Sequence, residues 1–192
     1  MSQPTRVPRQ DNRRIQLLDA AASLFAQNGF HGVSMRNIAR ATGMLAGSMY
    51  YHFPSKDDLL LATYEEGVRQ LSERVDVACI DVDDPWARLE AACKAHAEIL
   101  LDESDYAQVI LSVFPRDVPA IAESLKPLRD GYEERFRQLV DALPLAPDVD
   151  RHALRLMLLG ALNWSKIWYN PKRGSPSDIA AAMLTLLKKS LI

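Results

Sequence analysis

The side chains of Ser48, Tyr50, Tyr51 and His52 end in hydroxyl or imidazole groups, and Gly47 precedes them. Such polar tips, together with backbone N–H groups at helix starts, commonly bind phosphate oxygens. A glycine inside a helix costs about 1 kcal/mol relative to alanine. A close approach to a phosphate or base would explain that cost. The alternative is that Gly47 permits tight packing against another helix.

The neighbouring residues predict how this segment is held. Met49 and Phe53 are four positions apart, so both are expected to face inward. Tyr50 and Tyr51 point about 100° apart on a helix, so one of them is expected to be partly buried. Lys56 begins the next expected helix, where its charge and the free N–H groups of that helix predict a shared phosphate.

The distribution of charge indicates a polyanionic partner. Residues 1–56 hold seven Lys or Arg and two Asp, a net charge of +5. The remaining residues hold 16 basic and 23 acidic side chains, a net charge of −7. A basic head on an acidic body favours binding of a polyanion by the head alone. The alternative is chance clustering of surface arginines.

Length and composition indicate a globular protein of the cytoplasm. The chain has 192 residues, 48% hydrophobic and 25% charged, which suits one domain or two small ones. Its first 14 residues are polar, so we expect no signal peptide and no membrane partner. The most apolar later segment, 153–164, is too short to span a bilayer. Cys79 and Cys93 have no metal-type spacing and fit a reducing compartment.

The residue types of known catalytic and metal sites do not occur at the required spacings. Asp81 to Asp84 resembles the start of a calcium loop, but the glycine and glutamate that such a loop needs are replaced by Trp86 and Ala92. The sequence has no P-loop and no nucleophile elbow. We therefore expect neither a catalytic site nor a bound metal, and no metal-ligand spacing links the histidines, which are His31, His52, His96 and His152.

Helical periodicity runs through the whole chain. The first expected helix ends at Asn28-Gly29, the second is capped by Ser34, and a turn at 41–43 leads to the segment described above. No segment shows sustained period-two alternation, so we predict an all-α fold of about nine helices. Pro127 should kink or split one of the six later helices, expected at 55–77, 85–101, 104–114, 119–143, 148–169 and 177–191.

A helix, a three-residue turn with glycine and a second helix are typical of the helix-turn-helix. Residues 13–60, RRIQLLDAAASLFAQNGFHGVSMRNIARATGMLAGSMYYHFPSKDDLL, resemble the DNA-binding domain of the TetR family of transcriptional regulators. The resemblance implies three parts, which are a disordered basic arm (1–12), a helix-turn-helix domain (13–54) and a ligand-binding and dimerisation domain (55–192). It further implies a homodimeric, ligand-released repressor on a palindromic operator of double-stranded DNA.

The resemblance also implies which residues contact DNA. Many relatives have polar or charged residues just before the glycine, where this chain has Leu45-Ala46. Base reading by hydrogen bonds is therefore expected to be sparse, with apolar contact to thymine methyl groups in its place. Lys56 would bind a phosphate, and the other expected contacts are Ser34, Arg36, Leu45, Ala46, Gly47, Ser48, Tyr50, Tyr51 and His52.

Members of this family dimerise through their last two helices. Residues 153–164 are apolar nearly all round the helix, which favours burial on all sides. The alternative is a central helix in a monomer. The expected interface residues are Leu154, Met157, Leu158, Ala161, Ile179, Ala182, Met183 and Leu186.

The inner helices are expected to enclose an effector pocket. Its candidate residues are Trp86, His96, Tyr106, Phe114, Tyr132, Phe136 and Trp164, each of which has ordinary core packing as the alternative. Asn163-Trp164 and Trp168-Tyr169 resemble a TetR subset that regulates fatty-acid and steroid catabolism. That likeness implies an acyl-CoA or another apolar metabolite as effector, with no cofactor. The rival reading is an all-helical binding module or enzyme with an incidental helix-turn-helix.

Overall fold

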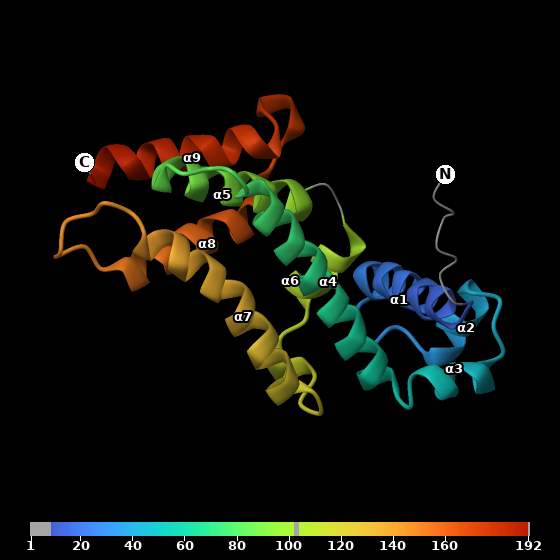
Figure 1. The fold of residues 1–192 in the computed structure, drawn as a ribbon. Coiled ribbons are helices and arrows are strands. Elements are labelled where there is room, and N and C mark those ends of the chain that lie inside the picture. Colours follow the sequence, from blue (N-terminus) through green and yellow to red (C-terminus); the bar gives the residue numbers. More distant parts are fainter. Residues whose placement is uncertain (1–8, 102–103, 192) are drawn as a thin grey trace, which may run out of the picture.

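The computed structural model describes residues 9–101 and 104–191, which form nine α-helices, two short 3₁₀ helices and no strand (Figure 1). The predicted all-α class and helix number are confirmed. The helices are α1 (Arg9–Asn28), α2 (Met35–Ala41), α3 (Ala46–His52), α4 (Lys56–Ala78), α5 (Pro85–Leu101), α6 (Asp105–Ser112), η1 (Pro115–Asp117), α7 (Ala122–Asp141), α8 (Arg151–Trp168), η2 (Pro171–Arg173) and α9 (Pro176–Leu191).

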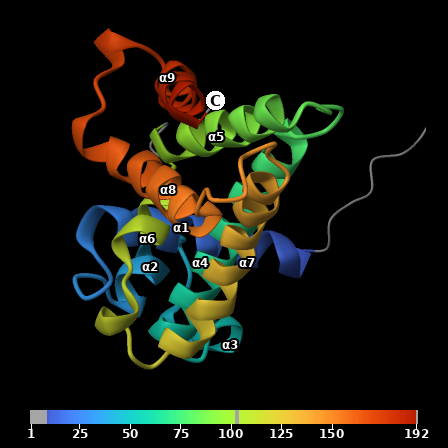
Figure 2. The ribbon, with the colours of Figure 1, turned by 90° about the vertical axis from the view of Figure 1, so that its left-hand side faces the viewer.

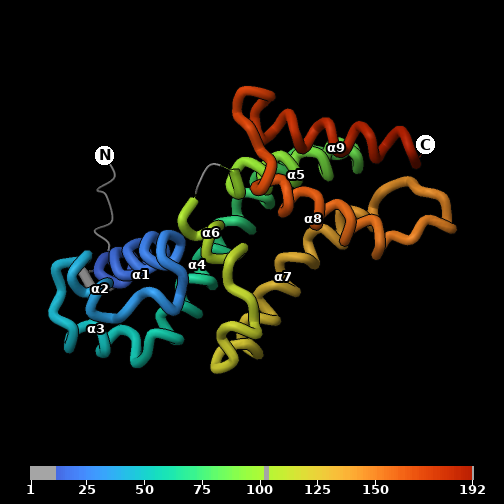
Figure 3. The backbone as a smooth tube through the Cα atoms, turned by 180° about the vertical axis from the view of Figure 1, so that it is seen from behind, coloured from blue at the N-terminus to red at the C-terminus, as the bar shows by residue number. Residues whose placement is uncertain are grey.

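The molecule is elongated, with α1, α2 and α3 at one end and α9 at the other (Figures 1 and 3). Helix α4 runs from the first group toward the second. Helix α9 lies along α5, and α8 passes below them, as the end-on view of α9 in Figure 2 makes clear. The structure therefore has a small N-terminal unit connected to a larger helical body through one long helix.

Local sequence explains the boundaries in the N-terminal unit. Helix α1 ends where Gly29 adopts a φ of +69°, and the turn after α2 uses Gly43 at +65°. Ser34 caps α2 and Ser55 caps α4, because each side chain accepts a hydrogen bond from a backbone N–H three residues on. Helix α1 begins at Arg9, so the last four residues of the expected arm are helical, and residues 1–8 lie outside the described residues.

Two hydrophobic cores hold the fold together. The first joins α1, α2 and α3 to the start of α4, and it also includes Tyr106 and Val109 of α6 and Leu125 of α7. The second joins the end of α4 to α5, α7, α8 and α9. The first core thus takes residues from both sides of the expected boundary at 54/55, and the small unit depends on the body for its packing.

The later helices begin and end close to their expected positions. Helix α5 matches its predicted range at both ends. Helix α7 is one continuous helix that contains Pro127, so this proline does not split it. Helix α6 ends at Ser112, two residues early, and η1 follows it from Pro115. Within residues 9–101 and 104–191, no helix has the length and apolarity needed to cross a membrane.

Candidate functional site

Helix α3 presents an unusual outer face. Leu45 occupies its N-cap position without a side-chain hydrogen bond and is 79% exposed, Tyr50 is 52% exposed and Tyr51 is 80% exposed. The inward placement of Met49 and Phe53 is confirmed, since both are buried in the first core. The expectation that one tyrosine is partly buried is wrong, because both tyrosines are exposed and Met49 is the one buried residue of α3.

Gly47 is exposed on this face, beside Ser48. A Cβ added at Gly47 would have no heavy atom of the described residues within 4 Å, apart from its own helix backbone and chain neighbours. The alternative that this glycine permits tight helix packing is therefore wrong. Among the described residues, no contact of this glycine therefore offsets its cost to helix stability.

The start of α2 adds a second polar edge. Ser34 forms a capping box with Asn37: its hydroxyl accepts from the Asn37 N–H, and the Asn37 side chain accepts from the Ser34 N–H at 2.9 Å. Ser34 is thus a structural cap as well as a candidate contact. Arg36 and Arg40 are exposed on α2, and neither forms an ion pair with another described residue.

Lys56 has a different place from the one expected. Its ammonium group donates hydrogen bonds to the carbonyl oxygens of Phe30 and Val33, both at 2.9 Å. The same group lies 4.1 Å from the centre of the Phe30 ring, a cation–π contact. Two of its three N–H donors therefore hold the α1–α2 connection against α4. These contacts give Lys56 a structural role, whereas the sequence predicted that it binds a phosphate.

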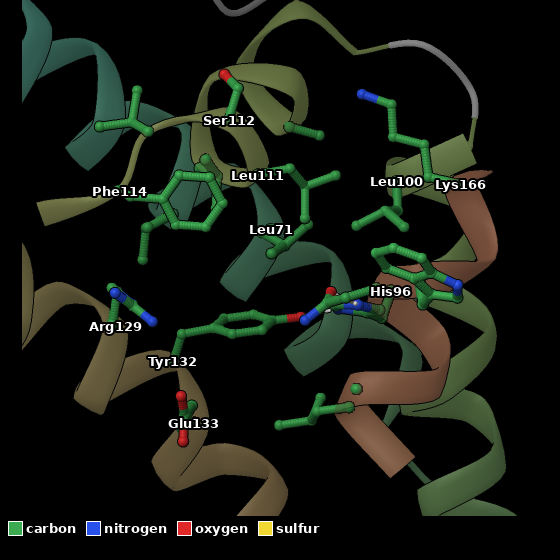
Figure 4. Close-up of a pocket in the computed structure, with 18 of the residues that line it drawn as sticks. Leu71, His96, Leu100, Leu111, Ser112, Phe114, Arg129, Tyr132, Glu133 and Lys166 are labelled. Atoms are coloured by element: carbon green, nitrogen blue, oxygen red, sulfur yellow. Dashed lines mark hydrogen bonds between the residues drawn. The ribbon is translucent and has the colours of Figure 1, made fainter. Parts of the chain in front are cut away.

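A cavity of about 680 Å³ lies between α4, α5, α6, α7 and α8 (Figure 4). Of the seven expected pocket residues, His96, Phe114, Tyr132 and Trp164 line it. Most of the other lining side chains are aliphatic, such as Leu71, Leu100 and Leu111 on three different helices. The volume and the apolar walls are typical of a small-molecule site.

The other three expected pocket residues do not line the cavity. Trp86 is buried in the second core near α9, where Lys188 lies over its ring at 5.5 Å. Phe136 is fully buried one helical turn beyond Tyr132. Tyr106 points toward α1 and donates a hydrogen bond to Asp19 at 2.8 Å. Helical phase explains the outcome for Tyr106, because its neighbour Ala107 takes the cavity-facing position.

Charged residues that the sequence did not single out also line the cavity. Arg129 and Lys166 lie at opposite sides of the view in Figure 4, and neither has an ion-pair partner in the described part of the chain. Glu133 is paired with Arg155 of α8. Partial burial lowers the pKa of Lys166. Arg129, Tyr132 and Glu133 have the i, i+3, i+4 spacing of one helix face, a signal that could have grouped them.

His96 is held in the cavity wall by two polar side chains. Its Nδ1 lies 2.6 Å from the Tyr132 hydroxyl, and its Nε2 lies 3.1 Å from Oδ1 of Asn163. Burial lowers the pKa of His96 to about 4, and the hydrogen bond with Asn163 opposes this only in part. Burial likewise raises the pKa of the Tyr132 phenol. The three side chains are therefore neutral at physiological pH.

The low pKa of His96 predicts a pH-dependent stability. An unfolded histidine has a pKa near 6.5, so the unfolded chain binds this proton first as the pH falls. Stability from His96 is complete above pH 6.5 and decreases toward pH 4, by up to about 3 kcal/mol. We expect urea denaturation between pH 6.5 and pH 4 to show that the free energy of unfolding decreases less for His96→Gln than for the wild type as the pH falls. If the free energy of unfolding changes with pH equally in both proteins, His96 does not have a lowered pKa in the folded state.

Helices α8 and α9 carry an exposed apolar face. Met157, Ala161 and Trp164 on α8 are exposed, as are Ala182 and Leu186 on α9. Ile179 and Met183 are half-buried. Leu154 and Leu158 contradict the interface prediction: they are 6% and 3% exposed within the protomer's own second core. Helix α8 therefore buries one side internally and leaves the other apolar side uncovered.

In the part of the chain that the structure describes, no group of three or more His, Cys, Asp or Glu is arranged to hold a metal ion. Cys79 and Cys93 are free and buried, and burial raises the pKa of both thiols.

Comparison with known proteins agrees with both halves of the structure. Residues 17–63 match the family described as bacterial regulatory proteins, tetR family. Residues 82–191, more than half of the chain, match the family described as tetracyclin repressor-like, C-terminal domain.

Relatives that match over most of their length are also transcriptional regulators. The transcriptional activator FasR of Mycolicibacterium smegmatis is 28% identical over 91% of this chain and 80% of its own. The transcriptional repressor KstR2 of Mycobacterium tuberculosis is 28% identical over 84% of this chain and 83% of its own. The crystal structure of AibR in complex with isovaleryl coenzyme A and operator DNA has a TM-score of 0.74 at 25% identity, covering 91% of this chain and 97% of that one. The chain belongs to the TetR family and is a DNA-binding transcriptional regulator, which is not an enzyme.

Proposed function

We propose that the chain is a repressor that binds a palindromic operator as a homodimer and is released by an acyl-CoA or a similar apolar metabolite. The observation that carries this proposal is the cavity of about 680 Å³, whose apolar walls include two cations, Arg129 and Lys166, without ion-pair partners among the described residues. An effector with an apolar chain and anionic groups fits such a lining. AibR, which binds isovaleryl coenzyme A, supports the same class.

The DNA-binding face consists of α3 and the start of α2. Tyr50, Tyr51, His52 and Ser48 contact phosphates, and Gly47 lets the helix backbone approach the groove. Leu45 and Ala46 read thymine methyl groups, while Arg36 supplies a polar base contact. Lys56 acts indirectly, because it holds the α1–α2 connection.

The dimer forms through the uncovered apolar face of α8 and α9, as four helices from two protomers. Exposed Trp164 (65%) and Leu186 (71%) make this face costly to leave in water. Two recognition helices on two half-sites also need a two-fold partner. Met157, Ala161 and Ala182 complete the contact, with Ile179 and Met183 at its edge.

Release requires that the effector favour one arrangement of the body over another. Helix α6 is the element through which this preference passes. Its Ile110 lines the cavity and also packs against Gly67 of α4. The two helices are so close there that a Cβ atom added to Gly67 would lie only 2.9 Å from the Ile110 side chain. Its Tyr106 donates to Asp19 of α1. An occupant that displaces α6 therefore acts on both α4 and α1.

Selection of bound DNA from a random pool tests the proposal. We expect enrichment of a palindrome, and loss of bound DNA when decanoyl-CoA is added at saturation. Operator affinity should fall steeply with salt, because phosphate contacts release counterions. A single unrepeated half-site would contradict the dimer, and unchanged affinity at saturating decanoyl-CoA would remove this ligand class as the effector.

A further inference from the structure

The hydrogen-bond network around His96 determines which polar groups face the cavity. Tyr132 extends from α7 across the cavity toward His96 on α5, as Figure 4 shows, and Asn163 reaches His96 from α8. His96 is 2% exposed, so its two ring nitrogens have no solvent to bind. The positions of the protons in this network therefore follow from which side-chain atoms face the ring nitrogens.

Donor and acceptor accounting fixes that arrangement. A neutral imidazole has one N–H donor and one acceptor nitrogen. The Asn163 Oδ1 atom only accepts, so the His96 Nε2 must carry the proton, 3.1 Å away. The His96 Nδ1 is then the acceptor, and the Tyr132 hydroxyl donates to it at 2.6 Å. The single proton of the phenol is thus already used.

The amide nitrogen of Asn163 is left with its donors available. Its Nδ2 atom forms no hydrogen bond with any described residue, while Asn163 lines the cavity. With the Tyr132 proton committed, this NH₂ group is the donor that the network presents to an occupant. Glu133, on the opposite wall, is neutralised by Arg155 and offers only acceptor oxygens.

We infer that Asn163 reads the carbonyl oxygen of the effector's acyl group, and that His96 and Tyr132 are positioning residues that keep its amide NH₂ directed into the cavity. This inference rests on the proposed function, since it assigns the polar contact of the proposed acyl thioester. A carbonyl oxygen accepts without donating, so it complements an NH₂ group. An apolar chain without that oxygen offers these N–H groups no acceptor.

The test compares two probes that differ in that oxygen. Decanoyl-CoA carries the thioester carbonyl, and S-decyl-CoA is the thioether without it. Isothermal titration calorimetry on the full chain should give about tenfold tighter binding of decanoyl-CoA, the value expected for one hydrogen bond. In Asn163→Leu the two affinities should differ less than twofold, with S-decyl-CoA bound about as in the wild type.

Two further variants separate positioning from simple packing. Tyr132→Phe removes the donor that holds Nδ1 as the acceptor, so the imidazole proton is no longer confined to Nε2 and the Asn163 amide can face His96 with either its oxygen or its nitrogen. The preference for decanoyl-CoA should then fall below tenfold, although the ring still fills its place. Ser112→Ala removes another polar group that lines the cavity and should keep the tenfold preference.

The possible results separate a failure of the Asn163 inference from a failure of the proposed effector class. Equal affinities of the two probes in the wild type would overturn the inference and leave the proposed effector class standing. A preference that survives in Asn163→Leu, or that is lost equally in Ser112→Ala, would also overturn it. If neither probe binds the wild type, the acyl-thioester class itself fails and the inference falls with it.

Discussion

Gly47→Ala should stabilise the protein and abolish most of its DNA binding. Alanine is favoured over glycine in a helix by about 1 kcal/mol, and the added methyl group meets no atom of the described protomer apart from its own helix and chain neighbours. The same methyl group stands on the exposed face of α3 between Ala46 and Ser48, which the proposed function places against the DNA backbone. We expect a rise in the urea midpoint together with at least tenfold weaker operator binding by fluorescence anisotropy.

Gly131→Ala is the matched control. This glycine is also exposed inside a helix, α7, and an added Cβ there likewise meets nothing within 4 Å. The control should show the same stabilisation with unchanged operator affinity. If Gly47→Ala and Gly131→Ala bind the operator equally, α3 does not approach DNA through Gly47, and another surface must be the DNA-binding face.

Lys56→Met should destabilise the N-terminal unit by about 3 kcal/mol, since hydrogen bonds from a charged group contribute about 1.5–3 kcal/mol each. The variant loses the ammonium group that binds the Phe30 and Val33 carbonyls and retains a side chain of similar length. We expect a lower urea midpoint, and operator binding that weakens in parallel as the unit loses its fixed shape.

Lys126→Met serves as the control for Lys56→Met. Lys126 is exposed on α7 and makes no ion pair with a described residue, so its loss should change the midpoint little. The competing idea gives Lys56 a phosphate. It predicts an unchanged midpoint and a salt dependence of binding that is flatter by about one unit. The urea midpoint and the salt slope together distinguish the two roles.

Periodicity and capping residues were sufficient for the helices, because those signals are local. Ser34, Gly43 and Ser55 each fix a boundary through the backbone of their own neighbours. The same applies to the inward positions of Met49 and Phe53, which follow from helical spacing. The family resemblance then supplied the arrangement that local signals do not contain.

Contacts between distant segments could not be read from the sequence. Lys56 was assigned by its place at a helix start, but its partners lie 26 and 23 residues earlier in the chain. Leu154 and Met157 belong to one apolar helix, and only the position of α7 and α5 decides that Leu154 is internal. The hydrogen-bond partner of Tyr106, Asp19, likewise lies 87 residues away in the chain.

The bonds of Lys56 also have a mechanical consequence. Because they connect the first residue of α4 to the α1–α2 connection, the N-terminal unit would turn together with α4 as one rigid body. Helix α4 has 23 residues, and at 1.5 Å per residue it is about 34 Å long. A rotation of about 5° around its far end would carry Lys56 through about 3 Å. That displacement is close to the spacing of one base pair, so a small change in the body would shift a recognition helix by about one step of the DNA.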